Sequence, residues 1–184
     1  KSYKFSVYLK SALESPEEML DVINALGNAT EDDIVEIHIN SGGGSLTSLD
    51  SLIFAMIRCP AHIHAIGSGI IASAATFPLL HADSFELSPN TQLLFHSMSF
   101  GDWGKSQDVL EYVNFAHDHG DKLMRETYRH LFSEEELDDI IKNKRERWLT
   151  SDEFMARFNK RNELMQKESE ESEAEADRLL DEMF

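Results

Sequence analysis

The chain has 184 residues, of which 41% are hydrophobic, and a formal net charge of −17. This length suits one α/β domain with a sizeable core, and no apolar run approaches the ~20 residues that span a bilayer. The negative charge argues against nucleic acids and anionic membrane surfaces as partners.

The first half of the chain alternates between expected strands and helices. Apolar and polar residues alternate over 3–9, which predicts a strand. Ser15-Pro16-Glu17-Glu18 has the N-cap, proline and glutamate of a capping box, so a helix is expected from there to Gly27. Strands are then expected at 34–39 and 63–66, and helices at 46–57 and from about Ser73. This order predicts βαβ crossovers and a largely parallel sheet.

The second half is expected to be richer in helix. Two short strands are predicted at 85–87 and 91–95, followed by a long helix over 105–131 that Gly120 should weaken by about 1 kcal/mol and bend. Ser133-Glu-Glu-Glu136 is a second capping box. A strand or turn at 148–150 leads into a last helix, whose end is rich in glutamate. We expect one domain over 1–157 and an acidic helical tail over 158–184, which is either a solvated extension or a helix that binds a partner.

A glycine-rich segment, Asn40-Ser-Gly-Gly-Gly-Ser45, separates the second expected strand from the next helix. Glycines let the backbone approach a ligand closely and point N–H groups at it. A phosphate loop would need a lysine that is missing here, and the dinucleotide fingerprint has a different spacing. An oxyanion hole needs only one or two N–H donors, so it fits better. A plain turn is the alternative.

Two residues suggest nucleophilic catalysis. Ser73 lies in the small-residue segment Gly69-Ile-Ile-Ala-Ser-Ala-Ala75, where a strand becomes a helix, and His96 ends an apolar strand. A serine at a helix N-terminus faces free N–H groups, and a nearby histidine can act as its base. Each residue alone is also compatible with ordinary packing. Together with the glycine segment they lie at the carboxyl ends of strands of one sheet, where sites form, and this favours a serine hydrolase.

The remaining histidines and the single cysteine are assigned no chemistry. His62 and His64 alternate along a strand, and His117, His119 and His130 lie on a helix, so no metal site and no cofactor are expected. Cys59 excludes an intrachain disulfide and favours a cytoplasmic location.

Residues 3–157 resemble the Clp-type serine proteases, the proteolytic subunits that have the ClpP/crotonase fold. The matching motifs are Asn40-Ser-Gly-Gly-Gly, Gly69-Ile-Ile-Ala-Ser73, Ser88-Pro-Asn-Thr-Gln-Leu-Leu-Phe-His96 and Arg145-Glu-Arg-Trp-Leu-Thr150. The resemblance implies an α/β fold of repeated βαβ units with a protruding long helix, the handle, which interlocks two heptameric rings in this family.

The resemblance also implies roles for individual residues. Ser73 would be the nucleophile and His96 its general base, while the backbone N–H groups of Gly44 and Ala74 would form the oxyanion hole. The family usually has an aspartate as third member where this chain has Glu146. Glutamate can also orient and stabilise an imidazole. Asp152 and Asp139 are the other candidates for this role, and a plain surface position for Glu146 is the alternative.

The implied function is that of a serine endopeptidase, which hydrolyses peptides or unfolded proteins through an acyl-enzyme inside an oligomeric ring chamber. An AAA+ unfoldase is a candidate partner, and the cytoplasm of a bacterial or phage-infected cell is the expected location. Where the family has proline and methionine, the chain has Gly42 and Ala74, so a divergent and bacteriophage-encoded member is expected. The alternatives are a catalytically silent structural protein, a phage head-maturation protease and, last, a crotonase-like acyl-CoA enzyme.

Overall fold

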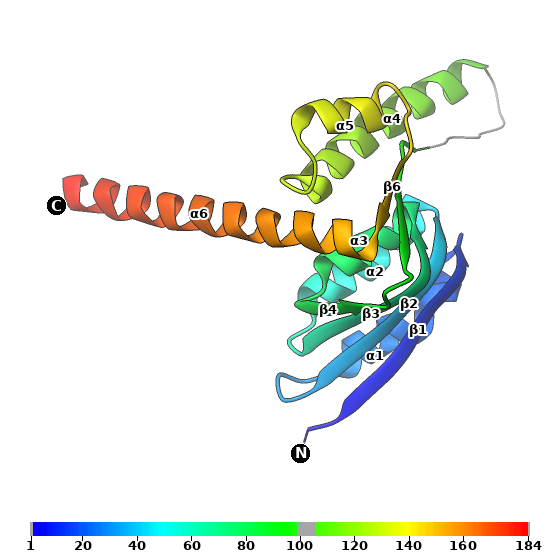
Figure 1. Ribbon diagram of the computed structural model, residues 1–184, viewed down its shortest axis with the longest axis horizontal. Coiled ribbons are helices and arrows are strands. Elements are labelled where there is room, and N and C mark those ends of the chain that lie inside the picture. The colour runs from blue at the N-terminus through cyan, green and yellow to red at the C-terminus, as the bar shows by residue number, and fades with distance from the viewer. Residues whose placement is uncertain (1, 99–105, 184) are drawn as a thin grey trace.

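A computed structural model describes residues 2–98 and 106–183 as a curved β-sheet with helices packed on one face and two helical projections (Figure 1). The elements, in chain order, are β1 (Lys4–Leu13), the 3-10 helix η1 (Pro16–Met19), α1 (Leu20–Asn28), β2 (Ile34–Gly44), α2 (Leu46–Arg58), β3 (His62–Ala72), the 3-10 turn η2 (Ser73–Ala75), α3 (Thr76–His81), β4 (Ser84–Leu87), β5 (Gln92–Phe95), α4 (Ser106–Tyr128), α5 (Glu134–Ile141), β6 (Arg147–Thr150) and α6 (Ser151–Met183).

The sheet has the order β1-β2-β3-β5-β6, and β4 pairs with β3 beside this path. All pairs are parallel except β5 with β6, which is antiparallel. The strand β3 changes partner along its length, because its residues 64–67 pair with β4 and its residues 70–72 pair with β5. The expected α/β class and the largely parallel sheet are therefore confirmed. Because β1, β2 and β3 are parallel neighbours, their carboxyl ends meet at one edge of the sheet.

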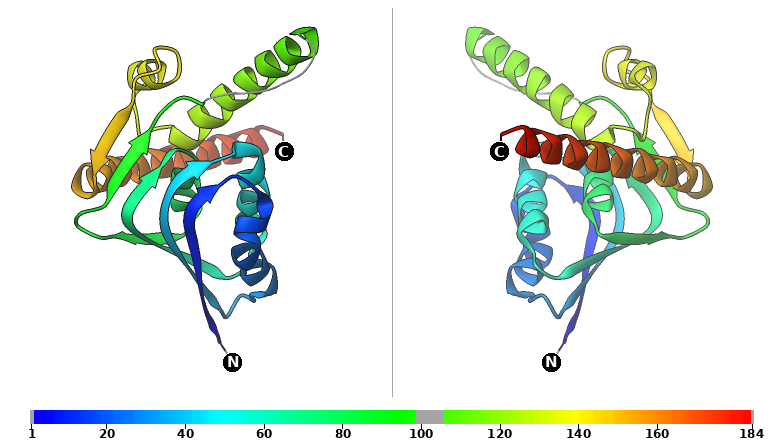
Figure 2. Two further views of the ribbon diagram at one scale, coloured as in Figure 1. Left: turned by 90° about the vertical axis from the view of Figure 1, so that its right-hand side faces the viewer. Right: turned by 90° about the vertical axis from the view of Figure 1, so that its left-hand side faces the viewer.

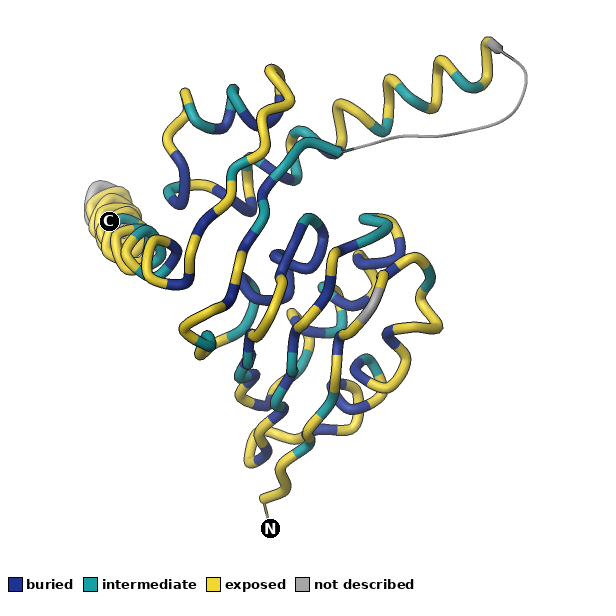
Figure 3. The backbone as a smooth tube through the Cα atoms, turned by 45° about the vertical axis from the view of Figure 1, so that its right-hand side comes forward, coloured by how far each residue is buried: buried dark blue, intermediate teal, exposed yellow. Residues whose placement is uncertain are grey.

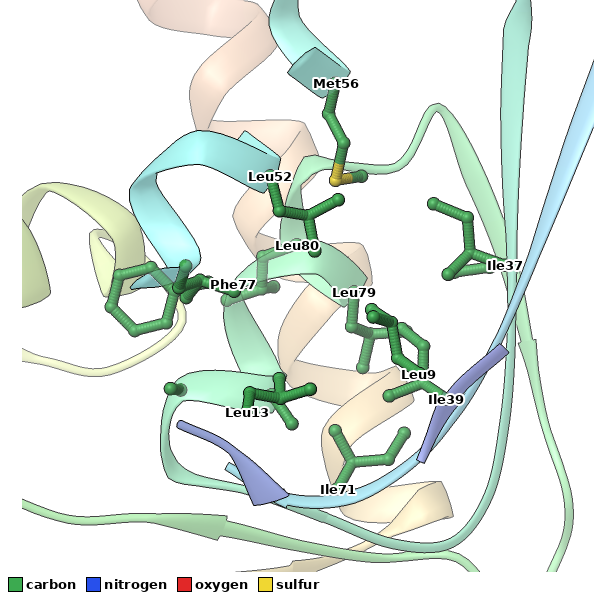
Figure 4. Packing of buried hydrophobic residues seen from close by; sticks show 14 of the residues in the cluster. Leu9, Leu13, Ile37, Ile39, Leu52, Met56, Ile71, Phe77, Leu79 and Leu80 are labelled. Carbon is green, nitrogen blue, oxygen red and sulfur yellow. The ribbon is translucent and has the colours of Figure 1, made fainter. Parts of the chain in front are cut away.

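The core lies between the sheet and the helices α1, α2 and α3, which cover one face of it (Figure 2). Leu9 and Ile37 from the strands pack with residues such as Leu52, Met56 and Leu79 from the helices (Figure 4). Along β2 and the first half of β3, buried residues alternate with more exposed ones (Figure 3). A face that alternates in this way has one side on the core and one side toward solvent.

Two helical projections extend from this body (Figure 1). The expected long helix is α4, and residue 105, where it was expected to begin, lies outside the described residues. The helix α6 runs unbroken for 33 residues, so the expected domain boundary after residue 157 falls within it. Its base is tied to α5 by Arg157, which donates to both oxygens of Glu136 at 2.9 and 2.8 Å. None of the helices in the described ranges combines the length and apolarity needed to cross a membrane.

Several boundaries differ from the expected ones. Both capping boxes form, at Ser15 and at Ser133, but the first opens a short 3-10 helix and Gly27 lies inside α1 instead of ending it. The strand β2 continues through the glycines to Gly44, and β3 continues to Ala72. Neither extension follows from hydrophobic patterning, because Ser-Gly-Gly-Gly at 41–44 and Gly-Ser-Gly-Ile-Ile-Ala at 67–72 do not alternate between apolar and polar side chains. Pairing with the neighbouring strands extends both.

Gly120 has a packing role that the sequence did not indicate. It is buried within α4, and a Cβ added there would overlap the Sδ and Cε atoms of Met98. On the same helix Val109 and Val113 are half-buried, whereas the large apolar residues Leu110, Tyr112 and Phe115 are exposed.

Candidate active site

The strand β3 ends at Ala72, and the chain turns sharply at Ser73. Ser73 has a positive φ of 56°, which is uncommon for a residue with a Cβ. Left-handed conformations of this kind cost of order 1 kcal/mol or more and cluster at functional sites. The turn η2 then passes into α3, and Ala74 and Ala75 are buried. Ser73 itself is only half-buried, so a strained elbow presents its side chain at the end of β3.

The glycines at the end of β2 pack directly against this elbow. Gly43 has a φ of 92°, and a Cβ there would lie 2.5 Å from the carbonyl oxygen of Ala72 and 2.7 Å from the Cβ of Ser73. A Cβ on Gly44 would lie 2.5 Å from the carbonyl group of Leu13 on β1. Only glycine fits either position without a shift. The expected glycine loop is thus a strand end that lets β1, β2 and the elbow approach one another closely.

A cavity of about 530 Å³ opens beside the elbow, and Gly44, Ser73, Ala74 and His96 all line it. The structure therefore brings four of the five expected site residues to one cavity. The rest of its wall is mixed: Glu14, Ser45 and Thr47 are polar, and the apolar residues come from α2, α3, α4 and the segment after β5. The apolar and aromatic lining consists of Leu46, Phe77, Met98, Tyr112, Met124 and Tyr128.

His96 follows directly on β5 and is half-buried. Among the described residues, no hydrogen bond joins Ser73 Oγ to the His96 imidazole. Hydrogen bonds between catalytic groups are often long in a site without substrate and shorten in the substrate complex. The two side chains share the cavity, and their pairing stays a prediction.

The three candidate carboxylates for the third position lie outside the lining of this cavity. Glu146 immediately precedes β6. Phe95 pairs with Arg147 in the antiparallel ladder, so one step further along this register His96 lies opposite Glu146. Glu146 is exposed, and the indole Nε1 of Trp148 donates a hydrogen bond of 3.2 Å to its Oε2.

The two fallback carboxylates have other positions. Asp139 accepts a hydrogen bond of 2.8 Å from Asn143 Nδ2 and forms an ion pair of 3.4 Å with Arg145. Asp152 is exposed in the first turn of α6. By strand register, Glu146 is the best placed of the three candidates, although its carboxylate bonds to Trp148 in this structure.

Two buried polar residues behind the elbow were missed by sequence reasoning. Thr76 Oγ1 donates a hydrogen bond of 2.7 Å to the carbonyl oxygen of Ser73, and it lies 2.8 Å from the hydroxyl of Tyr128. Thr76 and Tyr128 are both buried, and burial raises the pKa of Tyr128 well above its usual value. A threonine three residues after the serine is a local signal for such a backbone bond. The tyrosine is 52 residues away, and nothing in the sequence connects it.

Three other histidines bond to polar side chains outside this cavity. His62 and His64 both approach the Ser84 hydroxyl, at 2.7 and 2.8 Å, and His130 pairs with Glu168. Across the described part of the chain, no three or more histidine, cysteine, aspartate and glutamate residues are grouped so that they could hold a metal ion.

Comparison with known proteins relates the chain to a protease family. Residues 6–157 match the family described as Clp protease. The ATP-dependent Clp protease proteolytic subunit 3 of Rhizobium meliloti (strain 1021) is 28% identical over 162 residues, which cover 85% of this chain and 80% of that protein. The matched segment contains all five expected site residues.

Proposed function

The chain belongs to the Clp protease family, and from this premise we propose that it is a serine peptidase with Ser73 as nucleophile and His96 as general base. Family membership supports a peptidase function, and the members of this family form oligomeric rings that act on peptides and proteins. The observation that supports the finer proposal is the shared cavity, which is lined by the strained Ser73, by His96 and by Gly44 and Ala74.

The proposed reaction proceeds through an acyl-enzyme. His96 takes the hydroxyl proton of Ser73 while Oγ attacks the carbonyl carbon of the substrate, and the oxyanion accepts hydrogen bonds from the N–H groups of Gly44 and Ala74. The C–N bond then breaks, and His96 gives its proton to the leaving amine. Water attacks the ester, passing a proton to His96, and the acid leaves as Ser73 regains its proton.

The cavity wall suggests what the substrate presents beside the scissile bond. Phe77, Met124 and Tyr128 are buried at its apolar side. A volume of about 530 Å³ is large enough for a bulky side chain. We therefore expect cleavage after large apolar residues in peptides or unfolded segments.

Glu146 is proposed as the residue that orients His96. This role requires its carboxylate to exchange the indole of Trp148 for the imidazole when substrate binds or subunits assemble. Glu146→Gln should lower kcat by at least 10-fold, whereas Asp139→Asn should leave it within 2-fold of wild type. Equal activity of Glu146→Gln and wild type would assign Glu146 to the surface.

Assembly into a homo-oligomer is proposed from the exposed apolar side chains of α4. Leu110 and Phe115 are 57% and 69% exposed, and Tyr112 between them is 50% exposed. Apolar side chains grouped on a projecting helix indicate a protein contact. Light scattering at micromolar concentration should give a multiple of the 20.9 kDa chain mass. A monomer mass would contradict this proposal.

The direct test compares four proteins in a peptide-hydrolysis assay. Ser73→Ala and His96→Ala should each lower kcat by at least 1,000-fold. Ser68→Ala is the matched control, because Ser68 is an exposed serine on the same strand and lies outside the lining of the cavity. Full activity of Ser73→Ala would refute the assignment. Wild-type protein that assembles but cleaves nothing would favour the structural alternative, which the Trp148 bond to Glu146 also supports.

A further inference from the structure

A chain of hydrogen bonds connects the helix α4 to the nucleophile elbow. Thr76 Oγ1 donates to the Ser73 carbonyl oxygen, and the Tyr128 hydroxyl lies 2.8 Å from the same Oγ1. A threonine hydroxyl has one proton, and that proton is used on Ser73. Tyr128 must therefore be the donor of the second bond. The chain runs in one direction, from Tyr128 to Thr76 to the carbonyl group of Ser73.

Tyr128 is held rigidly at the start of this chain. Its ring is 1% exposed and makes edge-to-face contacts with Phe77, Phe95 and Phe132, at centroid distances of 5.5, 5.2 and 6.2 Å. Burial raises the pKa of Tyr128, so its hydroxyl keeps its proton and remains a donor at any pH near neutrality. The aromatic contacts hold the ring of Tyr128 in place, and this fixes the position of the hydroxyl that donates to Thr76.

The carbonyl group at the end of these hydrogen bonds belongs to the Ser73–Ala74 peptide, whose N–H is a proposed oxyanion donor. The C=O of Ser73 and the N–H of Ala74 are parts of one planar group, so the direction of one determines the direction of the other. The Ser73 carbonyl also accepts the backbone N–H of Thr76. Two donors on this oxygen hold the peptide plane, and hydrogen bonds to a carbonyl polarise the peptide and strengthen its N–H as a donor.

We propose that Thr76 and Tyr128 are positioning residues that lock the Ser73–Ala74 peptide so that the Ala74 N–H points at the oxyanion. The proposal rests on the proposed function, in which Ala74 supplies that donor. The positive φ of Ser73 explains why a lock is needed, because this conformation is not the one a serine adopts by itself. Without the hydrogen bonds of Thr76 and Tyr128 the peptide plane can rotate, and the Ala74 N–H then no longer points at the oxyanion.

A purely structural role makes different predictions from a positioning role. A structural role would lower stability and leave the chemistry of each folded molecule unchanged. A positioning role affects an interaction that is strongest in the transition state, so kcat falls while KM stays nearly constant. The test therefore measures kcat and KM separately, together with the thermal unfolding midpoint.

The variants are chosen to change one hydroxyl at a time. Thr76→Val keeps the shape of the side chain and removes its hydroxyl, Tyr128→Phe keeps the aromatic contacts, and Thr76→Ser keeps the hydroxyl and removes a methyl group. Tyr8→Phe is the matched control, because Tyr8 is exposed on β1 and lies outside the lining of the cavity.

The expected result is a separation between chemistry and binding. Thr76→Val should lower kcat by about 10- to 100-fold, which is less than the loss of a whole oxyanion donor, and KM should change by less than about 2-fold. Tyr128→Phe should lower kcat by a smaller factor, because Thr76 still donates. Thr76→Ser should restore most of the activity, and Tyr8→Phe should match wild type. Wild-type kcat in Thr76→Val, or a loss that Thr76→Ser does not recover, would overturn the proposal.

A separate measurement shows whether the proposed function itself is wrong. Labelling of wild type by a fluorophosphonate probe, and its absence in Ser73→Ala, tests the nucleophile without reference to Thr76. If wild type is not labelled at Ser73, the proposed function has failed, and crystal structures of wild type and Thr76→Val decide whether the lock exists. A Ser73–Ala74 peptide that turns in the variant supports the lock, and an unchanged peptide plane refutes it.

Discussion

Replacing Gly43 by alanine should damage the elbow although it changes neither residue of the proposed catalytic pair. The added Cβ would lie 2.5 Å from the Ala72 carbonyl oxygen, 2.7 Å from Ser73 Cβ and 2.9 Å from the Ala74 nitrogen. Ordinary contact begins at 3.4 Å, so these neighbours must move by several tenths of an ångström. All three belong to backbone or to the nucleophile itself, and none can rotate away.

Two effects add up in the expected magnitude. An alanine at a φ of 92° is strained by about 1–2 kcal/mol, and overpacking of a closed site costs about 1–3 kcal/mol. We expect the free energy of unfolding to fall by roughly 2–5 kcal/mol. Displacement of a reacting group by about 1 Å can cost ~100-fold in rate. Labelling of Ser73 by a fluorophosphonate should therefore slow by about that factor in molecules that remain folded.

Gly42→Ala is the matched control for this prediction. A Cβ on Gly42 meets nothing within 4 Å, and its φ is not positive. Alanine there should stay within about 1 kcal/mol of wild type. Urea unfolding and the labelling rate are measured on both variants. If Gly43→Ala and Gly42→Ala unfold and react alike, the close approach of β2 to the elbow does not support the site.

Two further predictions concern the base of α6 and the wall of the cavity. Hydrogen bonds from Arg157 hold the pKa of Glu136 at about 2, below its ordinary value of 4.5, so the carboxylate stabilises the fold above about pH 4.5 and this contribution is lost as the pH falls toward 2. Urea unfolding of wild type should lose about 1–2 kcal/mol more between pH 5 and pH 2 than Arg157→Gln does, and parallel pH profiles would contradict this. Gly120→Ala should displace the Met98 thioether within the cavity wall. KM for peptides with large apolar residues should therefore rise several-fold. The higher helix propensity of alanine, about 1 kcal/mol, should offset the loss of stability from this clash. An unchanged KM would contradict this prediction, because it would show that the displaced Met98 side chain does not alter substrate binding.

Local signals in the sequence predicted local structure well. The capping boxes at Ser15 and Ser133 form as expected, and the apolar spacing over 46–57 corresponds to α2 (Leu46–Arg58). The extensions of β2 and β3 were missed, because they depend on pairing with other strands and not on patterning. Gly120 was read as a weak point of a helix, and only the fold reveals Met98 beside it.

The candidate site was partly accessible from sequence for the same reason. Ser73 and His96 follow strands whose carboxyl ends meet, so their common cavity follows from a parallel sheet. The partner of Thr76 could not be found in this way, because Tyr128 reaches it through the packing of α4 on α3. The hydrogen bond from Trp148 to Glu146 could not be predicted either. The two residues are two positions apart, and hydrophobic patterning does not say that their side chains meet.

The central claim is that Ser73, His96 and the amides of Gly44 and Ala74 act together on one carbonyl group. The most direct measurement is a crystal structure of the protein after reaction with a fluorophosphonate. We expect phosphorus bonded to Ser73 Oγ, with the phosphoryl oxygen 2.7–3.1 Å from the nitrogens of Gly44 and Ala74, and the His96 imidazole beside the adduct. An adduct on another residue, or a phosphoryl oxygen that points away from both amides, would contradict the account.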